Sequence, residues 1–275
     1  MSNPKPTRYL THMAWPDVAA LDKKEGVVIL PIGAIEQHGP HLPTQTDTMI
    51  ATHMVDATLA QLPDAVKAWA LPTLNYGKST EHLKFPGTIS LSADTLVRVL
   101  HDIGRSISRA GFRRLAFVNG HGGNIALLDM VARDIRAETG LMCFCVHPGF
   151  YLEPPFPITP EEQRYGLHAG ETETSLILAI QPDTVQMDKA TKRFPDFPET
   201  DTPLFFVGKA SAAWLAHDWS DNGVFGDATL GTAEKGEALI EVAITYLTKL
   251  ITVISCFEVA HPNVADDAFS FTEIP

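Results

Sequence analysis

The sequence predicts an α/β fold with three layers, in which a mainly parallel sheet is covered by helices on both faces. Three short runs, Val27–Ile32, Arg114–Asn119 and Leu141–Val146, are apolar almost throughout. Continuous rather than alternating apolarity is typical of parallel strands that are buried on both faces. Helical patterns separate these runs, and strand–helix–strand alternation with short connections favours the α/β class.

The first part of the chain supplies two of the expected strands and two of the expected helices. Val27–Ile32 is the first strand. Thr48–Leu62 is expected to be a helix, with Asp47 as a plausible N-cap. Val66–Leu71 is a weaker strand candidate because a lysine interrupts it. Asp94–Ala110 is expected to be a helix because its apolar residues recur at the spacing of one helix face.

The second part of the chain continues the alternation. A helix is expected over Ile125–Thr139, with Gly140 as its C-terminal stop. A shorter helix is expected to begin within the segment that starts at His168 and to run to about Ile180. A long helical pattern over Thr232–Ile254, interrupted by one glycine, closes the fold.

Two segments, 148–160 and 191–203, are rich in loop residues. Loops at the edge of a site are often lids or substrate walls, and an ordinary surface loop explains these two segments equally well. Neither is long enough to be a domain linker. We therefore expect a single domain over residues 1–275.

Composition excludes several classes of function. The chain has 275 residues, 45% of them hydrophobic, and a net charge of −12 without a long Lys/Arg run. Such a chain is not expected to bind nucleic acid or an anionic membrane surface. The first residues lack the apolar core of a signal peptide, and no stretch reaches the roughly 18 apolar residues that span a bilayer. A cytoplasmic protein is expected.

The segment after the first strand carries a cluster of metal-binding residue types. Glu36 and His38 are two positions apart, so on an extended segment their side chains project to the same side. Asp47 follows at the head of the next helix, and His41 between them is a candidate to support a ligand. Taken singly, a polar loop or an N-cap explains these residues. Taken together they favour ligands to Zn²⁺, Mn²⁺ or Fe²⁺.

A second cluster, Asn119-Gly-His121-Gly-Gly-Asn124, lies where a strand passes into a helix. Glycines permit a tight turn there, and the helix N-terminus offers free N–H groups to an anion or oxyanion. An incidental histidine in a glycine-rich turn is the alternative, and the Lys-Ser/Thr pair of a phosphate-binding loop is missing. Because parallel strands end at one sheet edge, His121 is expected to lie near the first cluster.

A third cluster, His168-Ala-Gly-Glu171-Thr-Glu173-Thr-Ser175, begins a helix. His168 and Glu171 are three positions apart and can share a helix face. Two carboxylates within one turn repel each other unless positive charge lies near, and a metal pair would supply it. A favourable interaction with the helix dipole is the alternative. Together, the three clusters predict a metal-dependent hydrolase.

These clusters resemble the creatininase (creatinine amidohydrolase) family. The matching segments are Leu30–Pro43, Asp47–Thr48, Glu81–Thr88, Asn119–Asn124, His168–Ser175 and Gly223–Asp227, in the family's order. The resemblance implies a binuclear site for divalent metals, Zn²⁺ and/or Mn²⁺ with Fe²⁺ as a further option. It also implies an α/β fold and, usually, a homohexamer.

The resemblance assigns most of the ligands. By the family's pattern Glu36 and His121 hold one metal, His38 holds the other, and Asp47 bridges the two. In creatininase the second metal also uses a glutamate two residues after the histidine that matches His121. Here that position is Gly123, so one ligand has to come from elsewhere.

The third cluster is expected to supply that ligand. Relatives with the Gly-Gly form carry a glutamate where Glu171 stands, so Glu171 is expected to replace the missing ligand. Glu173 would then orient His168 or support a ligand. The implied reaction is cleavage of a non-peptide or cyclic C–N amide bond by metal-activated water, with His168 donating or shuttling a proton. The expected partner is a small-molecule amide.

Two other functions stay open. The family includes a formamide deformylase that acts on a pyrimidine nucleotide, which would need a basic pocket near Lys78 and Lys84. The other is a non-catalytic homologue that only binds a ligand or partner. Gly123 permits this interpretation because it replaces a residue that binds metal in creatininase. Creatinine itself is not the expected substrate. Creatininase walls its substrate with tryptophans, whereas residues 148–167 here contain none.

Overall fold

A computed structural model describes residues 7–148, 153–198 and 204–259 of the chain. At its centre lies a parallel sheet of four strands in the order β2-β1-β3-β4. The strands are β1 (Val27–Ile32), β2 (Ala68–Ala70), β3 (Arg114–Asn119) and β4 (Met142–Val146). The expected strands are confirmed, and the weaker candidate forms a strand of only three residues.

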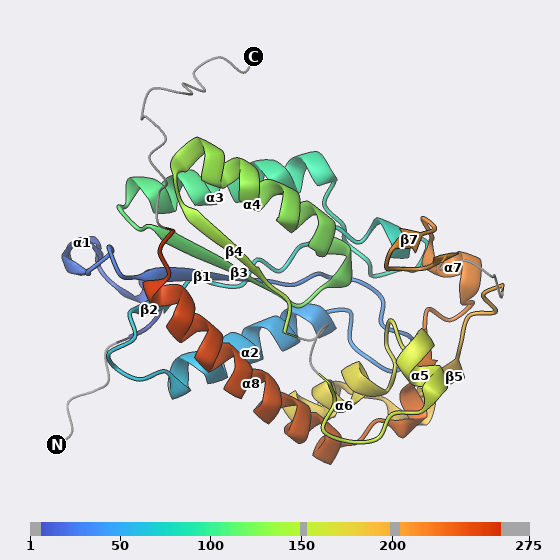
Figure 1. Ribbon diagram of the computed structural model, residues 1–275. Coiled ribbons are helices and arrows are strands. Elements are labelled where there is room, and N and C mark those ends of the chain that lie inside the picture. Colours follow the sequence, from blue (N-terminus) through green and yellow to red (C-terminus); the bar gives the residue numbers. More distant parts are fainter. Residues whose placement is uncertain (1–6, 149–152, 199–203, 260–275) are drawn as a thin grey trace.

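Helices cover both faces of this sheet, as Figure 1 shows. On one face lie α3 (Ala93–Arg109) and α4 (Ile125–Thr139). On the other lie α2 (Thr46–Gln61), α8 (Ala233–Cys256) and, beyond them, α6 (Glu171–Ile180). The three-layer α/β fold expected from the sequence is confirmed.

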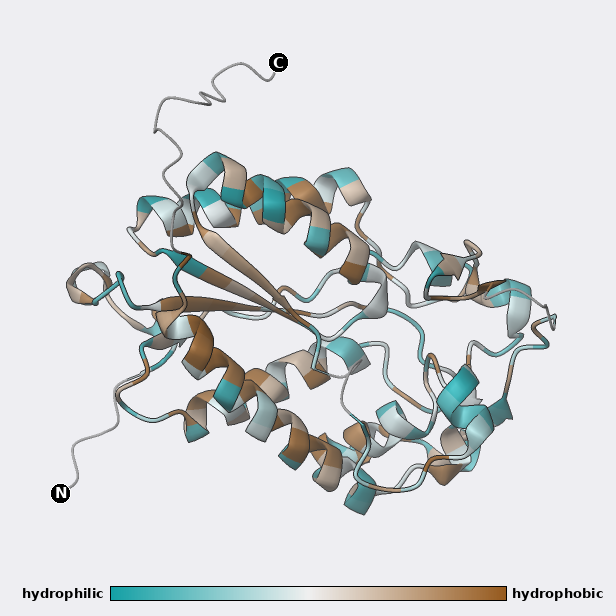
Figure 2. Ribbon diagram, in the orientation of Figure 1, coloured by the Kyte–Doolittle hydropathy of each residue, from teal (hydrophilic) through white to brown (hydrophobic). Residues whose placement is uncertain are grey.

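Side chains of β1 alternate between two hydrophobic cores. Val27 and Ile29 belong to the core that α2, α6 and α8 complete, whereas Val28, Leu30 and Ile32 belong to the core of α3 and α4. Every β1 residue is buried, which explains why the strand is apolar without alternation. In Figure 2 the central strands are accordingly coloured as hydrophobic along most of their length.

The pairing of β1 with β3 positions the functional segments. Val27 pairs with Arg114 and Ile32 pairs with Asn119, so the two strands end side by side. The segments that follow these strands therefore emerge next to each other at the carboxyl edge of the sheet.

Two helix ends test the expected caps. Gly140 caps α4 with a positive φ of 75°, as its predicted role as a stop requires. The predicted N-cap role of Asp47 is wrong, because α2 begins at Thr46 and its N-cap is Gln45. The Thr46 hydroxyl donates to Pro43 O (2.7 Å) and tightens the turn. Asp47 therefore lies inside the first helical turn, and its carboxylate is available to other partners.

Shorter elements surround the sheet. They are α1 (Trp15–Ala20), α5 (Pro160–Tyr165), α7 (Ala216–Trp219), β5 (Lys192–Arg193), β6 (Leu204–Phe205), β7 (Ala210–Ser211), β8 (Gly226–Asp227) and the 3₁₀ turns η1 (Leu10–His12), η2 (Thr80–His82), η3 (Gly122–Asn124), η4 (Pro182–Thr184), η5 (Met187–Lys189) and η6 (Ala228–Leu230). β5 pairs with β8 and β6 with β7. The loop segments 148–160 and 191–203 lie partly outside the described residues.

Helix α8 is long and apolar enough to cross a membrane by length and composition alone. This corrects the expectation that no segment of the chain reaches that length. In the structure α8 packs against α2 and α6, and Leu239, Leu247 and Ile251 on its inner face are buried in the core. Its apolar length is that of a core helix.

Gly236 sets how closely α8 approaches α6. A Cβ at this position would overlap the Ser175 carbonyl oxygen and lie 2.6 Å from the Ser175 carbonyl carbon. In an isolated helix, Gly→Ala stabilises the helix by about 1 kcal/mol. Here we expect Gly236→Ala to lower the free energy of unfolding by about 1–3 kcal/mol, as overpacking does. Chemical denaturation measures this change.

Exposed Glu237, the next residue on α8, provides the control. Glu237→Ala should change stability by no more than about 0.5 kcal/mol. A Gly236→Ala protein as stable as the wild type would show that the two helices are not in this contact.

Candidate metal centre

The loop after β1 brings Glu36 and His38 into one buried site. Its extended backbone is held by hydrogen bonds from Glu36 N–H to Thr44 O (2.9 Å) and from Ile89 N–H to Ile35 O (2.9 Å). Both side chains are almost fully buried. As expected for alternate residues of an extended segment, they reach the same cluster.

Asp47 lies between two histidines that follow different strands. Its Oδ1 is 3.1 Å from His38 Nε2, and its Oδ2 is 3.0 Å from His121 Nδ1. The carboxylate is buried at the start of α2, with 1% of the residue exposed. A carboxylate that directs one oxygen to each of two imidazoles has the arrangement of a bridging ligand.

A network of asparagine side chains holds His121 in place. His121 N–H donates to Asn119 Oδ1 (3.2 Å), and Asn119 Nδ2 donates to His121 O (2.6 Å). Asn124 Nδ2 ties the turn to the end of β1 by donating to Gly33 O (3.1 Å). Gly120 allows α2 to approach, because a Cβ there would lie 2.7 Å from the Asp47 carbonyl oxygen.

Three overlapping groups present ligand atoms within 4.8 Å of one another in the described part of the chain. They are Glu36, His38 and His168; Glu36, Glu81 and His121; and His38, Asp47 and Glu173. Within the second group, Glu36 Oε2 is 3.3 Å from His121 Nε2. Within the third, Glu173 Oε2 is 3.8 Å from His38 Nε2.

The structure separates the two glutamates of α6. Glu171 forms an ion pair with Lys235 of α8, and its backbone N–H donates to Glu162 Oε1 (2.8 Å). Glu173 instead lies beside His38. Two positions along a helix differ by about 200° around its axis, so the two side chains point to opposite sides. The structure therefore does not bring Glu171 to the ligand cluster, whereas Glu173 is part of it.

His168 is stacked between two other imidazoles. Its ring centroid is 4.2 Å from that of His38 and 4.2 Å from that of His82. We assign its proton to Nε2, which donates to Gln37 O (2.6 Å). Nδ1 then faces Glu36 Oε1 at 3.6 Å. Burial and the neighbouring histidines lower the pKa of His168 well below its usual value, so the ring is neutral near pH 7.

The expected link between Glu173 and His168 is not found among the hydrogen bonds of the described residues. Glu173 Oε2 instead accepts from Ala169 N–H (2.5 Å). His41 Nε2 lies 2.8 Å from the hydroxyl of Thr174, the residue after Glu173. Burial, with a contribution from nearby His38, lowers the pKa of His41 to about 4.

Glu81 and His82 also lie at the site, although they are not part of the three clusters of ligand residues in the sequence. Both lie in η2, where His82 Nε2 is 3.6 Å from Glu36 Oε1 and Glu81 Oε1 is 3.8 Å from His121 Nε2. The available signal was their adjacency in the segment 81–88, which matches the family pattern.

Close packing of charges shifts the pKa values of the cluster in opposite directions. Burial lowers the pKa of His38, but Asp47 and Glu173 outweigh burial and raise it to about 10. Glu36 and Asp47 likewise raise the pKa of His121 well above its usual value, against burial. Burial raises the pKa of Glu36, but the histidines outweigh burial and lower it well below its usual value. Burial raises the pKa of Glu173 to about 7.

The residues of this cluster fit divalent metal ions. Glu36 Oε2 and Asp47 Oδ2 are buried and have no hydrogen-bond partner within the residues that the structure describes. Both oxygens point toward His121, at 3.3 and 3.0 Å from its ring nitrogens. Buried carboxylate oxygens need a counter-charge. Carboxylate oxygens mixed with imidazole nitrogens suit Zn²⁺, Mn²⁺ and Fe²⁺.

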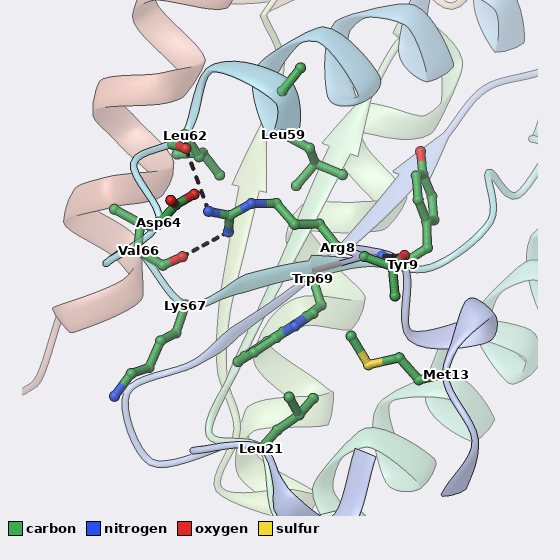
Figure 3. A pocket seen from close by; sticks show the side chains of 12 residues that line it. Arg8, Tyr9, Met13, Leu21, Leu59, Leu62, Asp64, Val66, Lys67 and Trp69 are labelled. Atoms are coloured by element: carbon green, nitrogen blue, oxygen red, sulfur yellow. Dashed lines mark hydrogen bonds between the residues drawn. The ribbon is translucent and has the colours of Figure 1, made fainter. Parts of the chain in front are cut away.

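A cavity of about 450 Å³ lies away from this cluster. Figure 3 shows its lining, which includes Arg8, Trp69 and Leu21. The Arg8 guanidinium reaches the carbonyl oxygens of Val66 and Pro63, each at 2.8 Å. Arg8 therefore ties the chain before β2 in place, and the cavity lining, which includes the carboxylate of Asp64, contains none of the residues of the cluster.

Comparison with known proteins identifies the family of this chain. The family model for creatininase, described as creatinine amidohydrolase, matches residues 11–251. The mycofactocin precursor peptide peptidase of Mycobacterium tuberculosis (strain ATCC 25618 / H37Rv) is 36% identical over 225 residues, which cover 79% of this chain and 81% of that protein. The creatinine amidohydrolase of Pseudomonas putida is 31% identical over 235 residues, 79% of this chain and 85% of that protein.

Solved structures extend the likeness to the fold. A manganese-containing creatininase superposes with a TM-score of 0.69 at 27% identity, and the match covers 90% of this chain and 98% of the creatininase chain. The residues that the family model matches, 11–251, include every ligand candidate described above. The chain therefore belongs to the creatininase family of amidohydrolases.

Proposed function

We propose that this chain is a binuclear metal-dependent amidohydrolase that cleaves a non-peptide or cyclic C–N amide bond. Glu36 and His121 would hold one divalent ion, His38 and Glu173 would hold the other, and Asp47 would be shared between them. The observation that carries this proposal is the placement of Asp47, whose two oxygens face His38 and His121 separately. Glu171 is paired with Lys235, whereas Glu173 lies beside His38. We therefore assign the ligand role to Glu173 in place of Glu171.

The chemistry follows from the donor set and from the neighbouring groups. When bound, two divalent ions supply a water of lowered pKa and polarise a carbonyl group. Zn²⁺ and Mn²⁺ are the ions we propose, with Fe²⁺ as a third option, and the comparison with a manganese-containing creatininase supports this choice. His168 is neutral and directs Nδ1 into the cluster, where it can take up a proton and pass it to the leaving nitrogen.

Gln37 holds His168 ready for this role. Its carbonyl oxygen accepts from His168 Nε2, and its side-chain Nε2 donates to His82 Nδ1 (2.8 Å). Both hydrogen bonds fix the rings of the two stacked histidines. A ring held in one orientation keeps its free nitrogen aimed at the reacting group.

A group of aromatic residues packs beside the cluster. Trp214 lies edge-on to His82 at a centroid distance of 6.3 Å, and it packs against Phe206 (5.6 Å) and Phe225 (5.3 Å). Phe206 and Phe225 are buried, so they support Trp214, whose partly exposed ring suits an uncharged, flat substrate. The nucleotide alternative has less support, because Lys78 donates to the Thr80 hydroxyl (3.0 Å) instead of facing a phosphate pocket.

The relatives leave the exact amide open, since one is named a peptidase and the other a creatinine amidohydrolase. A screen of cyclic amides, formamides and short peptides against the metal-loaded protein would identify the class. We propose a cytoplasmic homo-oligomer, with the hexamer that the family resemblance implies.

Asp47→Asn tests the bridging role. Removing one charge from a ligand shared by two ions should weaken the binding of both ions. The purified variant should therefore lose both metals, and its turnover should fall by at least about 100-fold. Elemental analysis measures the metal content. Turnover is measured with the substrate found in the screen. Asp134→Asn, at an exposed position of α4, is the matched control and should retain both properties. A fully active Asp47→Asn enzyme would contradict the proposal.

His168→Asn tests the proton-transfer role separately. Because His168 is not assigned as a ligand, the variant should keep two metals while kcat falls by roughly 10²–10⁴-fold, the usual contribution of general acid–base catalysis. His53→Asn, on α2, controls for the loss of an imidazole elsewhere. Unchanged turnover in His168→Asn would remove His168 from the mechanism.

Metal uptake should release protons. In the metal-free protein His38 and His121 have raised pKa values and are protonated at pH 7, and a ligand must be deprotonated to bind. Glu173, with a pKa of about 7, is also partly protonated, so we expect release of about two to three protons per chain and tighter binding as pH rises. Calorimetry in buffers of different ionisation enthalpy counts these protons. Binding that releases none would show that these imidazoles are not ligands.

A further inference from the structure

Gly123 leaves an opening in the metal centre that another side chain occupies. A Cβ at this position would overlap the Glu81 carboxylate and would lie 2.5 Å from both His121 Nε2 and the Lys78 carbonyl oxygen. No side chain at position 123 is therefore compatible with Glu81 in its present place. The glycine creates the space, and the carboxylate from η2 fills it.

Contacts of the two residues just before η2 position Glu81. Lys78 N–H donates to Asn124 Oδ1 (2.9 Å), which ties the start of this segment to the turn that carries His121. Ser79 N–H donates to Ser90 Oγ (2.8 Å), and Ser79 Oγ lies 3.3 Å from His121 Nε2. The backbone that carries Glu81 is thus anchored to the same turn as its neighbour His121.

The Glu81 carboxylate lies close to two candidate ligands. Glu81, Glu36 and His121 present ligand atoms within 4.8 Å of one another, and Glu36 Oε2 is buried without a hydrogen-bond partner in the described residues. Glu81 is 17% exposed at its side chain, whereas Glu36 is 1% exposed. Two carboxylates at this distance repel each other unless a cation lies between them.

We propose that Glu81 is a ligand of the divalent ion held by Glu36 and His121, and that Gly123 is required to admit it. This inference rests on the binuclear centre proposed above and extends it by one ligand from a different segment of the chain. The first ion would then be held by Glu36, Glu81 and His121 and the second by His38 and Glu173, with Asp47 shared between them.

Metal affinity tests the role of Glu81 without relying on activity. Glu81→Gln in the full-length protein should weaken one Mn²⁺ site by about 10–100-fold and leave the other unchanged. Calorimetry gives the two affinities, and Co²⁺ substitution gives an absorption spectrum that changes with the ligand set. Glu237→Gln, at an exposed position of α8, is the matched control and should alter neither.

A second set of variants tests the requirement for glycine. Gly123→Ala should displace the Glu81 carboxylate and weaken the same Mn²⁺ site. Glu81→Asp keeps a carboxylate on η2, so it should recover part of the affinity for that ion that Glu81→Ala loses. Recovery of this kind requires a folded protein and excludes misfolding as the cause of the loss.

The outcomes separate the two proposals. If the wild type binds two ions and Glu81→Gln binds both with unchanged affinity and Co²⁺ spectrum, Glu81 is not a ligand, even if turnover falls, and the binuclear centre stands. If the wild type itself binds no ions, the proposed function fails first.

Discussion

Burial of acidic side chains at the carboxyl edge of the parallel sheet is the constraint on which the rest of the structure depends. Glu36 and Asp47 are almost fully enclosed. An uncompensated buried carboxylate costs several kcal/mol, so the surrounding elements must bring partners to it. The paired ends of β1 and β3 place His121 beside the loop of Glu36 and His38. The first turn of α2 then places Asp47 between His38 and His121.

Much of this arrangement could be predicted from the sequence because it follows from local rules. Continuous apolar runs identified the buried parallel strands. Alternation along an extended segment placed Glu36 and His38 on one side, and the rule that parallel strands end at one edge placed His121 near them. These predictions needed no knowledge of side chains distant in the sequence, and the geometry of the structure agrees with them.

The remaining features depend on distant contacts and could not be predicted in the same way. Glu171 and Glu173 both lie in the first turn of α6, and only the approach of Lys235, 64 positions later, shows which of them faces away from the cluster. Glu81 lies in a 3₁₀ turn without a periodic pattern, so its nearness to Gly123 becomes visible only in three dimensions.

Local strain marks the same place. Ala169 has a φ of 53°, the only positive φ of a non-glycine residue within the described ranges, and it is fully buried. Such a conformation costs roughly 1–2 kcal/mol. Its N–H donates to Glu173 Oε2, so the strained residue helps to aim the carboxylate that we assign to the second ion. Strain of this kind persists where the surrounding structure requires it.

Anomalous diffraction from crystals of the Mn²⁺-loaded protein tests the central claim most directly. The account predicts two strong peaks per chain, about 3.5–4 Å apart as in other two-metal sites. One peak should lie between Glu36 and His121 and the other between His38 and Glu173, each within bonding distance of Asp47. A single peak, or two peaks that do not share Asp47, would contradict the account.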